Sequence, residues 1–322
     1  MKNELKVELY FPGFTRKSVT FTIDDGNIPF DEKFISIVKP GGLKGTFNLC
    51  GADRLSPEEY RRLYDGFEIA DHCKNHPTCF EDGVEYKFSD ELLDKLNSLS
   101  YTKENPIVYR TKTDKVYAIH KNPNREKPLG WAPITDKETY VSFVKEGFSE
   151  LETVFGKGNI KGYVWPFCEQ KNEALFDTIS SMGYNSIRKT GALEDTTGFK
   201  IPSDKMHWSY NATHKNLLSV MELYDKYPDD GGLKFFAFGL HSKDYEVDNK
   251  WGDLESFAKL YGNRPSEFWY ASVSRIFEYE SATKKLSVTE SSVSNNSDLT
   301  LYLAVNGKRI VLPPNGKFDV KN

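Results

Sequence analysis

The sequence lacks any hydrophobic run long enough to cross a membrane. Its longest apolar stretch is Phe235 to Leu240, whereas a membrane-spanning helix needs about 20 apolar residues. The first ten residues, Met1 to Tyr10, also lack the apolar segment of a signal peptide. We therefore expect no membrane partner and a cytoplasmic location, with secretion only if a signal has been removed.

Cysteine is scarce as well. The four cysteines, Cys50, Cys73, Cys79 and Cys168, show no CxxC spacing, and they are too few to staple a chain of 322 residues. We expect reduced thiols. A disulfide between Cys73 and Cys79 or a structural zinc site stays open as the alternative, although structural zinc needs four protein ligands.

Neither sign of charge dominates. The 47 acidic and 43 basic residues leave a formal net charge of −4, which gives no electrostatic footprint for nucleic acid or an anionic membrane. Aromatic residues are plentiful in contrast, because 22 Phe and 18 Tyr can fill a core and stack on sugars. The composition is that of a globular protein with one large α/β domain and an appendage, or with two domains.

Strand-like and amphipathic segments alternate along most of the chain. Helix starts are marked by Ser56-Pro57-Glu58-Glu59 and by a capping box from Thr135 to Glu138. The alternation predicts parallel strands covered by helices, in a barrel or an open doubly wound sheet. The count favours an α/β fold with a distorted (β/α) barrel of about seven strands. The strands are expected near 17–23, 45–49, 67–70, 160–165, 184–188, 233–240 and 268–271.

Two segments depart from that alternation. Residues 80–133 are polar and rich in Pro and Lys, with one short helical stretch near 90–99, and we interpret them as an insertion or lid. The last forty residues are rich in Ser and Asn, with short alternating runs. We therefore expect a barrel domain over 1–282 and a small β-strand tail over 283–322, in an oligomeric state that the sequence leaves open.

Two carboxylates stand together where a buried strand ends. Asp24-Asp25-Gly26 follows the β-rich segment from Lys17 to Ile23, and by itself this motif is common turn chemistry. At the carboxyl end of a strand, however, two adjacent carboxylates repel unless a cation holds one of them ionised. The other could then accept a proton, so the pair suits a metal ligand beside a base.

Histidine is rare, and three of the six histidines fall just after predicted strands. His72 and His76 are four residues apart, and two imidazoles can converge on one ion. With Asp25 they would leave coordination positions open, as catalytic sites require. His241 ends a strand and is a candidate general acid; solvated or core histidines are the alternatives. The remaining histidines have no such placement and are interpreted as surface or structural residues: His120, His207 and His214.

In this order, the motifs resemble the polysaccharide deacetylase family, carbohydrate esterase family 4 with its NodB-homology domain. VTFTIDDG (19–26), LKGTFNL (43–49) and EIADHCKNHP (68–77) are similar to its first motif, second strand and histidine motif. GYVWPF (162–167), SMGYNSIRKTG (181–191) and GLHSKDYE (239–246) resemble its later motifs. The similarity spans residues 10–280 and is interrupted at 80–133.

The resemblance implies a distorted (β/α) barrel and a hydrolase that removes acetyl groups from N-acetylated sugars, which is cleavage of a linear amide C–N bond. In some members the substrate is O-acetylated xylan. The resemblance also implies a divalent metal. From the ligand types zinc is the default, with cobalt, nickel or iron as alternatives. The implied roles are Asp24 as general base, Asp25, His72 and His76 as metal ligands, and His241 as general acid.

The chain departs from the family pattern in the loop after the strand at 160–165. Many members have an arginine two residues before the loop proline, where this chain has Val164, and Phe167-Cys168 replaces an aromatic-glycine pair. Our hypothesis is that Arg188 supplies the missing cation to Asp24. An ordinary surface arginine is the alternative.

Three aromatic residues complete the expected site. The backbone N–H of Phe167 would bind the oxyanion, and Trp165 and Trp208 are candidates for the acetyl or sugar pocket. A role in the aromatic core is equally open for Trp208. Two other functions also stay open, namely an O-acetyl esterase on the same residues and a non-catalytic glycan-binding relative, which Val164 suggests.

Overall fold

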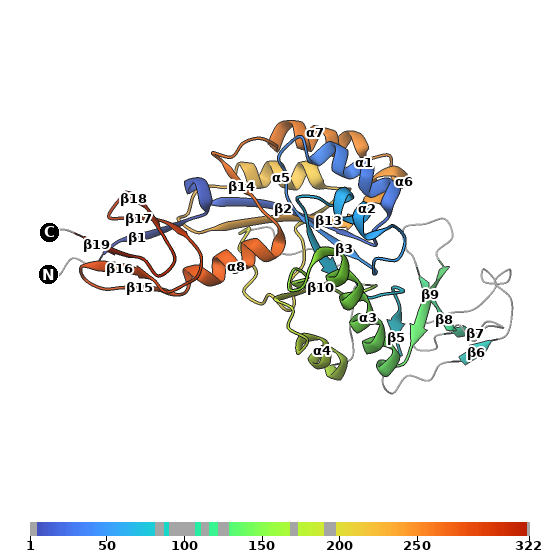
Figure 1. Cartoon of the computed structure of the whole chain (residues 1–322). Coiled ribbons are helices and arrows are strands. Elements are labelled where there is room, and N and C mark those ends of the chain that lie inside the picture. The colour runs from blue at the N-terminus through green and yellow to red at the C-terminus, as the bar shows by residue number, and fades with distance from the viewer. Residues whose placement is uncertain are drawn as a thin grey trace.

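A curled parallel sheet forms the centre of the molecule (Figure 1). The computed structural model describes residues 5–80, 87–89, 107–110, 116–121, 129–167, 173–189 and 198–320. Seven strands lie in the order β11-β10-β4-β3-β2-β13-β12, all in parallel pairs, and β14 pairs with the first three residues of β2. The expected distorted (β/α) barrel is confirmed, as a half-barrel of seven strands. The strands are β2 (Lys17–Asp24), β3 (Thr46–Leu49), β4 (Glu68–Asp71), β10 (Gly162–Val164), β11 (Ser186–Arg188), β12 (Ala212–Thr213), β13 (Lys234–His241) and β14 (Phe268–Tyr270).

Helices cover the outer face of this sheet (Figure 1). Helices α1, α5, α6 and α7 pack into one layer, and α3 packs on β4 between α2 and α4. The alternation of side chains in β2 is the reason, because Val19, Phe21 and Ile23 enter the main hydrophobic core while Thr20 and Thr22 face the other side. The helices are α1 (Ile28–Val38), α2 (Pro57–Leu63), α3 (Lys137–Phe155), α4 (Glu173–Ser180), α5 (Leu217–Asp225), α6 (Ser242–Val247), α7 (Trp251–Tyr261) and α8 (Val273–Thr283).

An irregular segment around residues 208–211 lies between β11 and β13. At its start, Trp208 pairs with the end of β11: Lys189 N donates to Trp208 O at 2.8 Å, and Arg188 forms a bridge with Trp208. Its last part pairs with β13, since Asn211 N donates to Ala237 O at 2.7 Å. The segment therefore covers β11, and the side chain of Arg188 is fully buried.

The carboxyl-terminal tail is a pair of small antiparallel sheets, β1-β17-β18 and β15-β16-β19. The expected barrel domain began at residue 1, but β1 (Val7–Tyr10) pairs with β17 of the tail over its whole length. Long-range pairing decides this placement, and it brings both chain ends to the tail (Figure 1). The short 3-10 helix η1 (Pro12–Phe14) leads back to β2. The other tail strands are β15 (Leu286–Val288), β16 (Ser292–Asn295), β17 (Leu301–Val305), β18 (Lys308–Leu312) and β19 (Lys317–Asp319).

The segment expected to be an insertion contributes a separate five-stranded sheet in the order β5-β9-β8-β7-β6. The sequence predicted little regular structure there, because its strands are short and lack clear alternation. The helical stretch expected near 90–99 lies outside the described residues. The strands are β5 (Thr78–Cys79), β6 (Lys87–Ser89), β7 (Ile107–Arg110), β8 (Val116–Lys121) and β9 (Leu129–Thr135).

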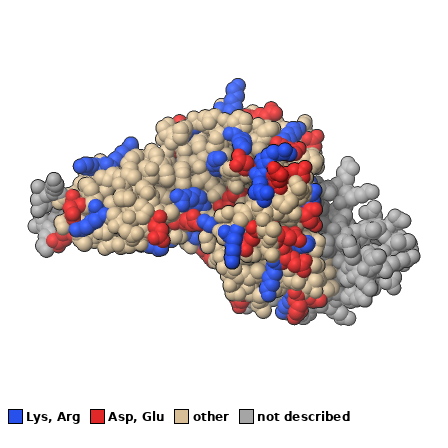
Figure 2. All heavy atoms as spheres, viewed as in Figure 1, with Lys and Arg blue, Asp and Glu red and all other residues tan. Residues whose placement is uncertain are grey.

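Two predicted helix starts can be compared with the structure. Ser56 is the N-cap of α2, as expected, and with Glu59 it forms a capping box. At α3 the cap is Asp136, which accepts from Thr139 N at 2.7 Å, because Thr135 still belongs to β9. No helix in the described ranges is long and apolar enough to span a bilayer. On the face shown in Figure 2, acidic and basic side chains are interspersed.

Candidate active site

The register of the sheet places three polar residues in one row. His241 lies opposite Asp24 in the pairing of β13 with β2, and Asn48 lies opposite Asp24 in the pairing of β2 with β3. Because the strands are parallel, all three side chains stand at the carboxyl end of the sheet. This is the end at which α/β barrels and open α/β sheets bind their ligands.

The backbone turn after β2 separates the two neighbouring carboxylates. Asp25 has φ 75° and Gly26 has φ 63°, a left-handed conformation that costs a residue with a side chain about 1–3 kcal/mol. A Cβ on Gly26 would lie 2.9 Å from the Leu49 side chain, so glycine is required at that position. As a result, Asp24 is buried while the Asp25 side chain remains partly exposed.

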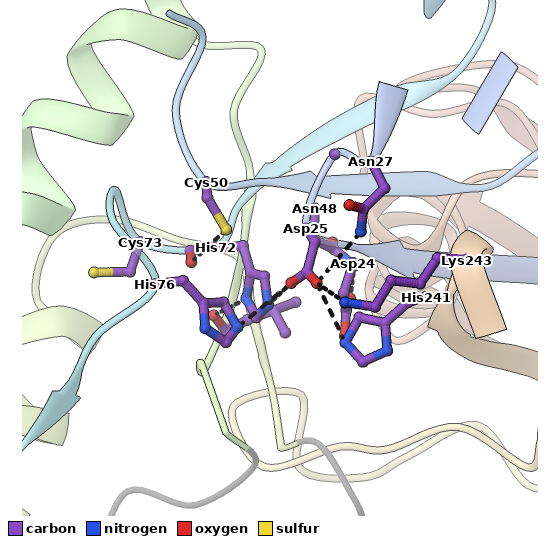
Figure 3. A network of polar contacts seen from close by, with 12 residues as sticks. Asp24, Asp25, Asn27, Asn48, Cys50, His72, Cys73, His76, His241 and Lys243 are labelled. Carbon is purple, nitrogen blue, oxygen red and sulfur yellow. Dashed lines mark hydrogen bonds and ion pairs between the residues drawn. The ribbon is translucent and has the colours of Figure 1, made fainter. Parts of the chain in front are cut away.

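Asp25, His72 and His76 converge in a cluster that can hold a metal ion (Figure 3). Asp25 Oδ1 lies 3.5 Å from His72 Nε2 and 3.4 Å from His76 Nε2, and the three ligand atoms lie within 4.8 Å of one another. Asp25 Oδ1 is buried and has no hydrogen-bond partner among the described residues. A buried acceptor without a donor is costly, so a cation between these three atoms fits the arrangement.

Both imidazoles turn Nε2 toward Asp25. His72 Nδ1 lies 2.8 Å from the carbonyl oxygen of Val164; a carbonyl can only accept, so Nδ1 carries a proton and Nε2 is the nitrogen that could bind a metal. His76 packs edge-on against His72 and Phe167. Burial, and then the neighbouring His72, lowers the pKa of His76 to about 4, which keeps its ring neutral at neutral pH.

Arg188 and Asn48 hold Asp24 as an ionised carboxylate. Arg188 Nη2 lies 2.5 Å from both oxygens of Asp24, and Asn48 Nδ2 donates to Oδ1 at 2.7 Å. Burial opposes ionisation, but the Arg188 charge, followed by those of the nearby imidazoles, outweighs it and lowers the pKa of Asp24. The Arg188 guanidinium also lies 5.3 Å from the centre of the Tyr210 ring. That ring packs closely on Gly239, where an added Cβ would come within 2.7 Å of it.

His241 faces the other oxygen of Asp25. His241 Nε2 lies 3.6 Å from Asp25 Oδ2, and its Nδ1–H donates to Asp244 Oδ2 at 2.8 Å. Burial disfavours the charged ring, but the bond to Asp244 and the charge of Asp25 outweigh it and raise the pKa of His241 to about 9. Lys243 Nζ lies 3.7 Å from the same Asp25 oxygen. A protonated imidazole thus faces one oxygen of Asp25, while His72 and His76 face the other.

The sequence profile of the family described as polysaccharide deacetylase matches residues 12–187, more than half of the chain. The chain belongs to the polysaccharide deacetylase family. Its members are hydrolases that act on acetylated carbohydrates. No curated protein sequence matches the chain closely enough to count as a relative.

Solved structures of polysaccharide deacetylases and carbohydrate esterases align with most of the chain. A Mycobacterium smegmatis protein assigned as a polysaccharide deacetylase aligns with 15% identity over 88% of this chain and 96% of its own, at a TM-score of 0.50. The family 4 esterase domain of a xylanase from the hindgut metagenome of Trinervitermes trinervoides aligns with 14% identity, 83% and 92% coverage, and a TM-score of 0.44. The peptidoglycan deacetylase PdaC of Bacillus subtilis aligns with 12% identity, 84% and 94% coverage, and a TM-score of 0.43.

The structure of this polysaccharide deacetylase family member brings most of the expected site residues together. Phe167 lies beside His76, with ring centres 4.4 Å apart, so its backbone remains at the site. The two tryptophans lie elsewhere. Trp165 is buried against Tyr163 in the main core, and Trp208 is buried in a second core between the sheet, α8 and the tail. Both indoles are buried, with 3% and 2% exposure, so we interpret them as packing residues, which for Trp208 is the core alternative.

Three contributors to the site were missed from the sequence. Asn48 lies within the expected strand GTFNL, where a polar residue between apolar ones is a usable signal. Asp244 and Lys243 follow His241 closely, but adjacency alone does not show which way a side chain points. All three were found because the fold directs them at Asp24, Asp25 or His241.

His207 and His214 bond to carboxylates outside the cluster of Asp25, His72 and His76, whereas Cys50 Sγ lies 3.6 Å from the carbonyl oxygen of His72. His207 pairs with Asp204 near the surface, and the buried His214 bonds to Asp248 at 2.7 Å. The side chain of His120 and the whole of Cys168 lie outside the described residues. Cys50 and Cys73 are thiols, so a disulfide between Cys73 and Cys79 is not formed.

Proposed function

We propose that this polysaccharide deacetylase family member is a metal-dependent hydrolase that cleaves the acetamido C–N bond of N-acetylated sugar units. One observation carries the proposal. Asp25 offers one buried oxygen to the imidazoles of His72 and His76 and the other to a protonated imidazole, with the ionised Asp24 next to it in the chain. This combination supplies a metal site, a base and an acid within one cluster.

Asp25, His72 and His76 are the residues that would hold the metal, and zinc suits two nitrogens and one oxygen. When bound, the ion would supply Lewis-acid activation of water and of the acetyl carbonyl. The ligands would occupy only part of its coordination sphere, which leaves room for both. Cobalt, nickel or iron would fit the same donors.

Asp24 is the proposed general base. Its charge is maintained by Arg188 and Asn48, so it can take a proton from the attacking water at neutral pH. The backbone N–H of Phe167 is the proposed donor to the oxyanion that develops on the acetyl oxygen. Phe167 has φ 58°, an uncommon conformation for a phenylalanine in the loop beside His76.

His241 is the proposed general acid. An amine leaves only after it is protonated, and the raised pKa of His241 keeps a proton on its ring for that step. A cation bound at Asp25 would offset part of the carboxylate charge and bring this pKa down toward neutrality. An acid that stays protonated at neutral pH suits an amide, whose amine must be protonated before it leaves. An ester, which would release an alcohol, is the alternative substrate for the same residues.

The test is release of acetate from N-acetylated chito-oligosaccharides and from acetylated xylan, with the zinc-loaded protein. We expect turnover on the N-acetylated substrate, and its loss in Asp24→Asn and His241→Ala. Faster release from xylan would replace the proposal with an O-acetyl esterase. Sugar binding without turnover on either substrate would point to a non-catalytic glycan-binding protein.

A further inference from the structure

A buried carboxylate in the first turn of α1 has no part in the proposed chemistry. The Asp31 side chain is completely buried, and it accepts hydrogen bonds from Ser242 Oγ at 2.5 Å and from Tyr64 Oη at 2.8 Å. Burying a carboxyl group is costly even when it is hydrogen-bonded. Burial disfavours the ionised form of Asp31 and raises its pKa to about 7. A residue that is expensive to bury calls for a structural explanation.

The bond to Ser242 lies next to a strained backbone. Ser242 follows His241, and Leu240 before it has φ 101°, a conformation that costs a leucine about 1–3 kcal/mol and persists only where neighbours enforce it. On the amino-terminal side, the pairing of β13 with β2 holds the chain up to His241. On the carboxyl-terminal side, Ser242 is fully buried and its hydroxyl is held by Asp31.

Asp31 is also bonded, through its backbone, to the segment that carries Asp25. Asp31 N donates to Asn27 O at 2.9 Å, and the Asn27 side chain reaches Asp25 Oδ2 at 3.4 Å. Asp31 therefore links two segments that are distant in the chain, one leading from Asp25 and one leading from His241. Tyr64, at the carboxyl-terminal end of α2, closes the network from a third element.

We propose that Asp31 and Ser242 are positioning residues that hold the strained Leu240–His241 turn, and with it the His241 ring, at its place opposite Asp25. The inference rests on the proposed function, since His241 matters there as the acid. Neither Asp31 nor Ser242 touches the reacting atoms. Their effect runs through the orientation of His241.

The first variant is Ser242→Ala, which removes one hydroxyl and the bond to Asp31. We expect kcat to fall about 10- to 100-fold, since a misplaced acid loses its alignment with the leaving group. KM and the zinc affinity should stay unchanged, because Asp25, His72 and His76 keep their supports. Zinc affinity, measured by titration calorimetry, is the readout that does not depend on activity.

The matched control is Ser274→Ala. Ser274 is also a buried serine whose Oγ bonds a carboxylate, that of Glu68 at 3.0 Å, but it lies on α8, away from His241. Both variants should lose similar stability, and only Ser242→Ala should lose turnover. Asp31→Leu should behave as Ser242→Ala does. Asp31→Asn should retain the turnover that Asp31→Leu loses, because an amide can accept a hydrogen bond from one of the Ser242 and Tyr64 hydroxyls and donate to the other.

Crystal structures of zinc-loaded wild type and Ser242→Ala separate this inference from the proposed function. We expect the distance from His241 Nε2 to Asp25 Oδ2 to change from 3.6 Å, or the ring to adopt two orientations. An unmoved His241, whatever the turnover, would overturn the inference. A displaced His241 in a protein whose wild type releases no acetate would uphold the positioning and overturn the proposed function.

Discussion

Arg188 and Asp24 form an ion pair in the interior of the barrel. Arg188 Nη2 lies 2.5 Å from Asp24 Oδ2, and the two side chains are 0% and 3% exposed. They come from β11 and β2, which are separated by three strands in the sheet. The pair therefore spans the hollow of the half-barrel. The ion pair supports the hypothesis that Arg188 replaces the arginine that many family members have at the position of Val164.

Replacing Arg188 by methionine should abolish most turnover and destabilise the protein. A buried carboxylate without its partner costs about 3–5 kcal/mol of unfolding free energy, and Asp24 would then be protonated and unable to act as a base. We expect kcat to fall at least about 100-fold. Urea unfolding and acetate release measure the two effects.

The double variant Asp24→Asn with Arg188→Met is the control for this pair. The double variant should recover much of the unfolding free energy that Arg188→Met loses, because neither charge remains buried. It should still show no turnover. If Arg188→Met alone retained wild-type turnover, Arg188 would be a structural residue only.

Zinc should stabilise the protein through the Asp25, His72 and His76 cluster. A ligand that binds only the folded state at 100 times its Kd adds about 2.7 kcal/mol, so the unfolding temperature should rise with zinc and fall back with a chelator. Asp25→Asn and His76→Ala should each remove the rise. His207→Ala, which changes a surface histidine paired with Asp204, should keep it.

Removing the charge of Lys243 should tighten metal binding. Lys243 Nζ lies 3.7 Å from Asp25 Oδ2, where it neutralises a carboxylate that the metal also needs. The side chain is 33% exposed, so solvent weakens the effect, and we expect Lys243→Met to lower the zinc Kd by about three- to tenfold. Lys215→Met is the control, because Lys215 pairs with Asp248 instead. Equal zinc affinity in all three proteins would contradict the prediction.

Stability should depend on pH through Asp31. Its pKa rises from 3.8 in the unfolded chain to about 7 in the fold, so the folded protein keeps a proton that the unfolded chain releases. The contribution to stability is complete below pH 3.8 and is lost as the pH rises through 7. Asp31→Asn has no such group, so relative to wild type it should gain about 1 kcal/mol per pH unit across this window.

Urea unfolding of the metal-free proteins at pH 5 and pH 8 measures this difference. Asp71 and Glu68 also have raised pKa values, but they titrate in both proteins and cancel. The same difference at both pH values would show that the Asp31 carboxyl titrates normally.

Several site residues could be predicted because strand ends are visible in the sequence. Asp24, Asp25 and His241 follow β-rich runs, and parallel strands bring their carboxyl ends to one edge. Arg188 was inferred from a gap in a family motif. Asn48 and Asp31 could not be found in this way, because their roles depend on contacts with residues 24 and 211 positions away. Asp244 is only three residues from His241, but the direction of its side chain is not visible in the sequence. The same limit explains why Trp165 and Trp208 were expected at the pocket.

The amino-acid sequence by itself determined the alternation of strands and helices, and with it the barrel and the kinds of side chain at its carboxyl edge. These properties are local, since they follow from periodicity, capping and turn residues. Only the tertiary structure decided the strand register, the left-handed turn at Asp25, the membership of β1 in the tail and the direction of each imidazole. Those features depend on which distant segments pack together, and packing is a property of the whole chain.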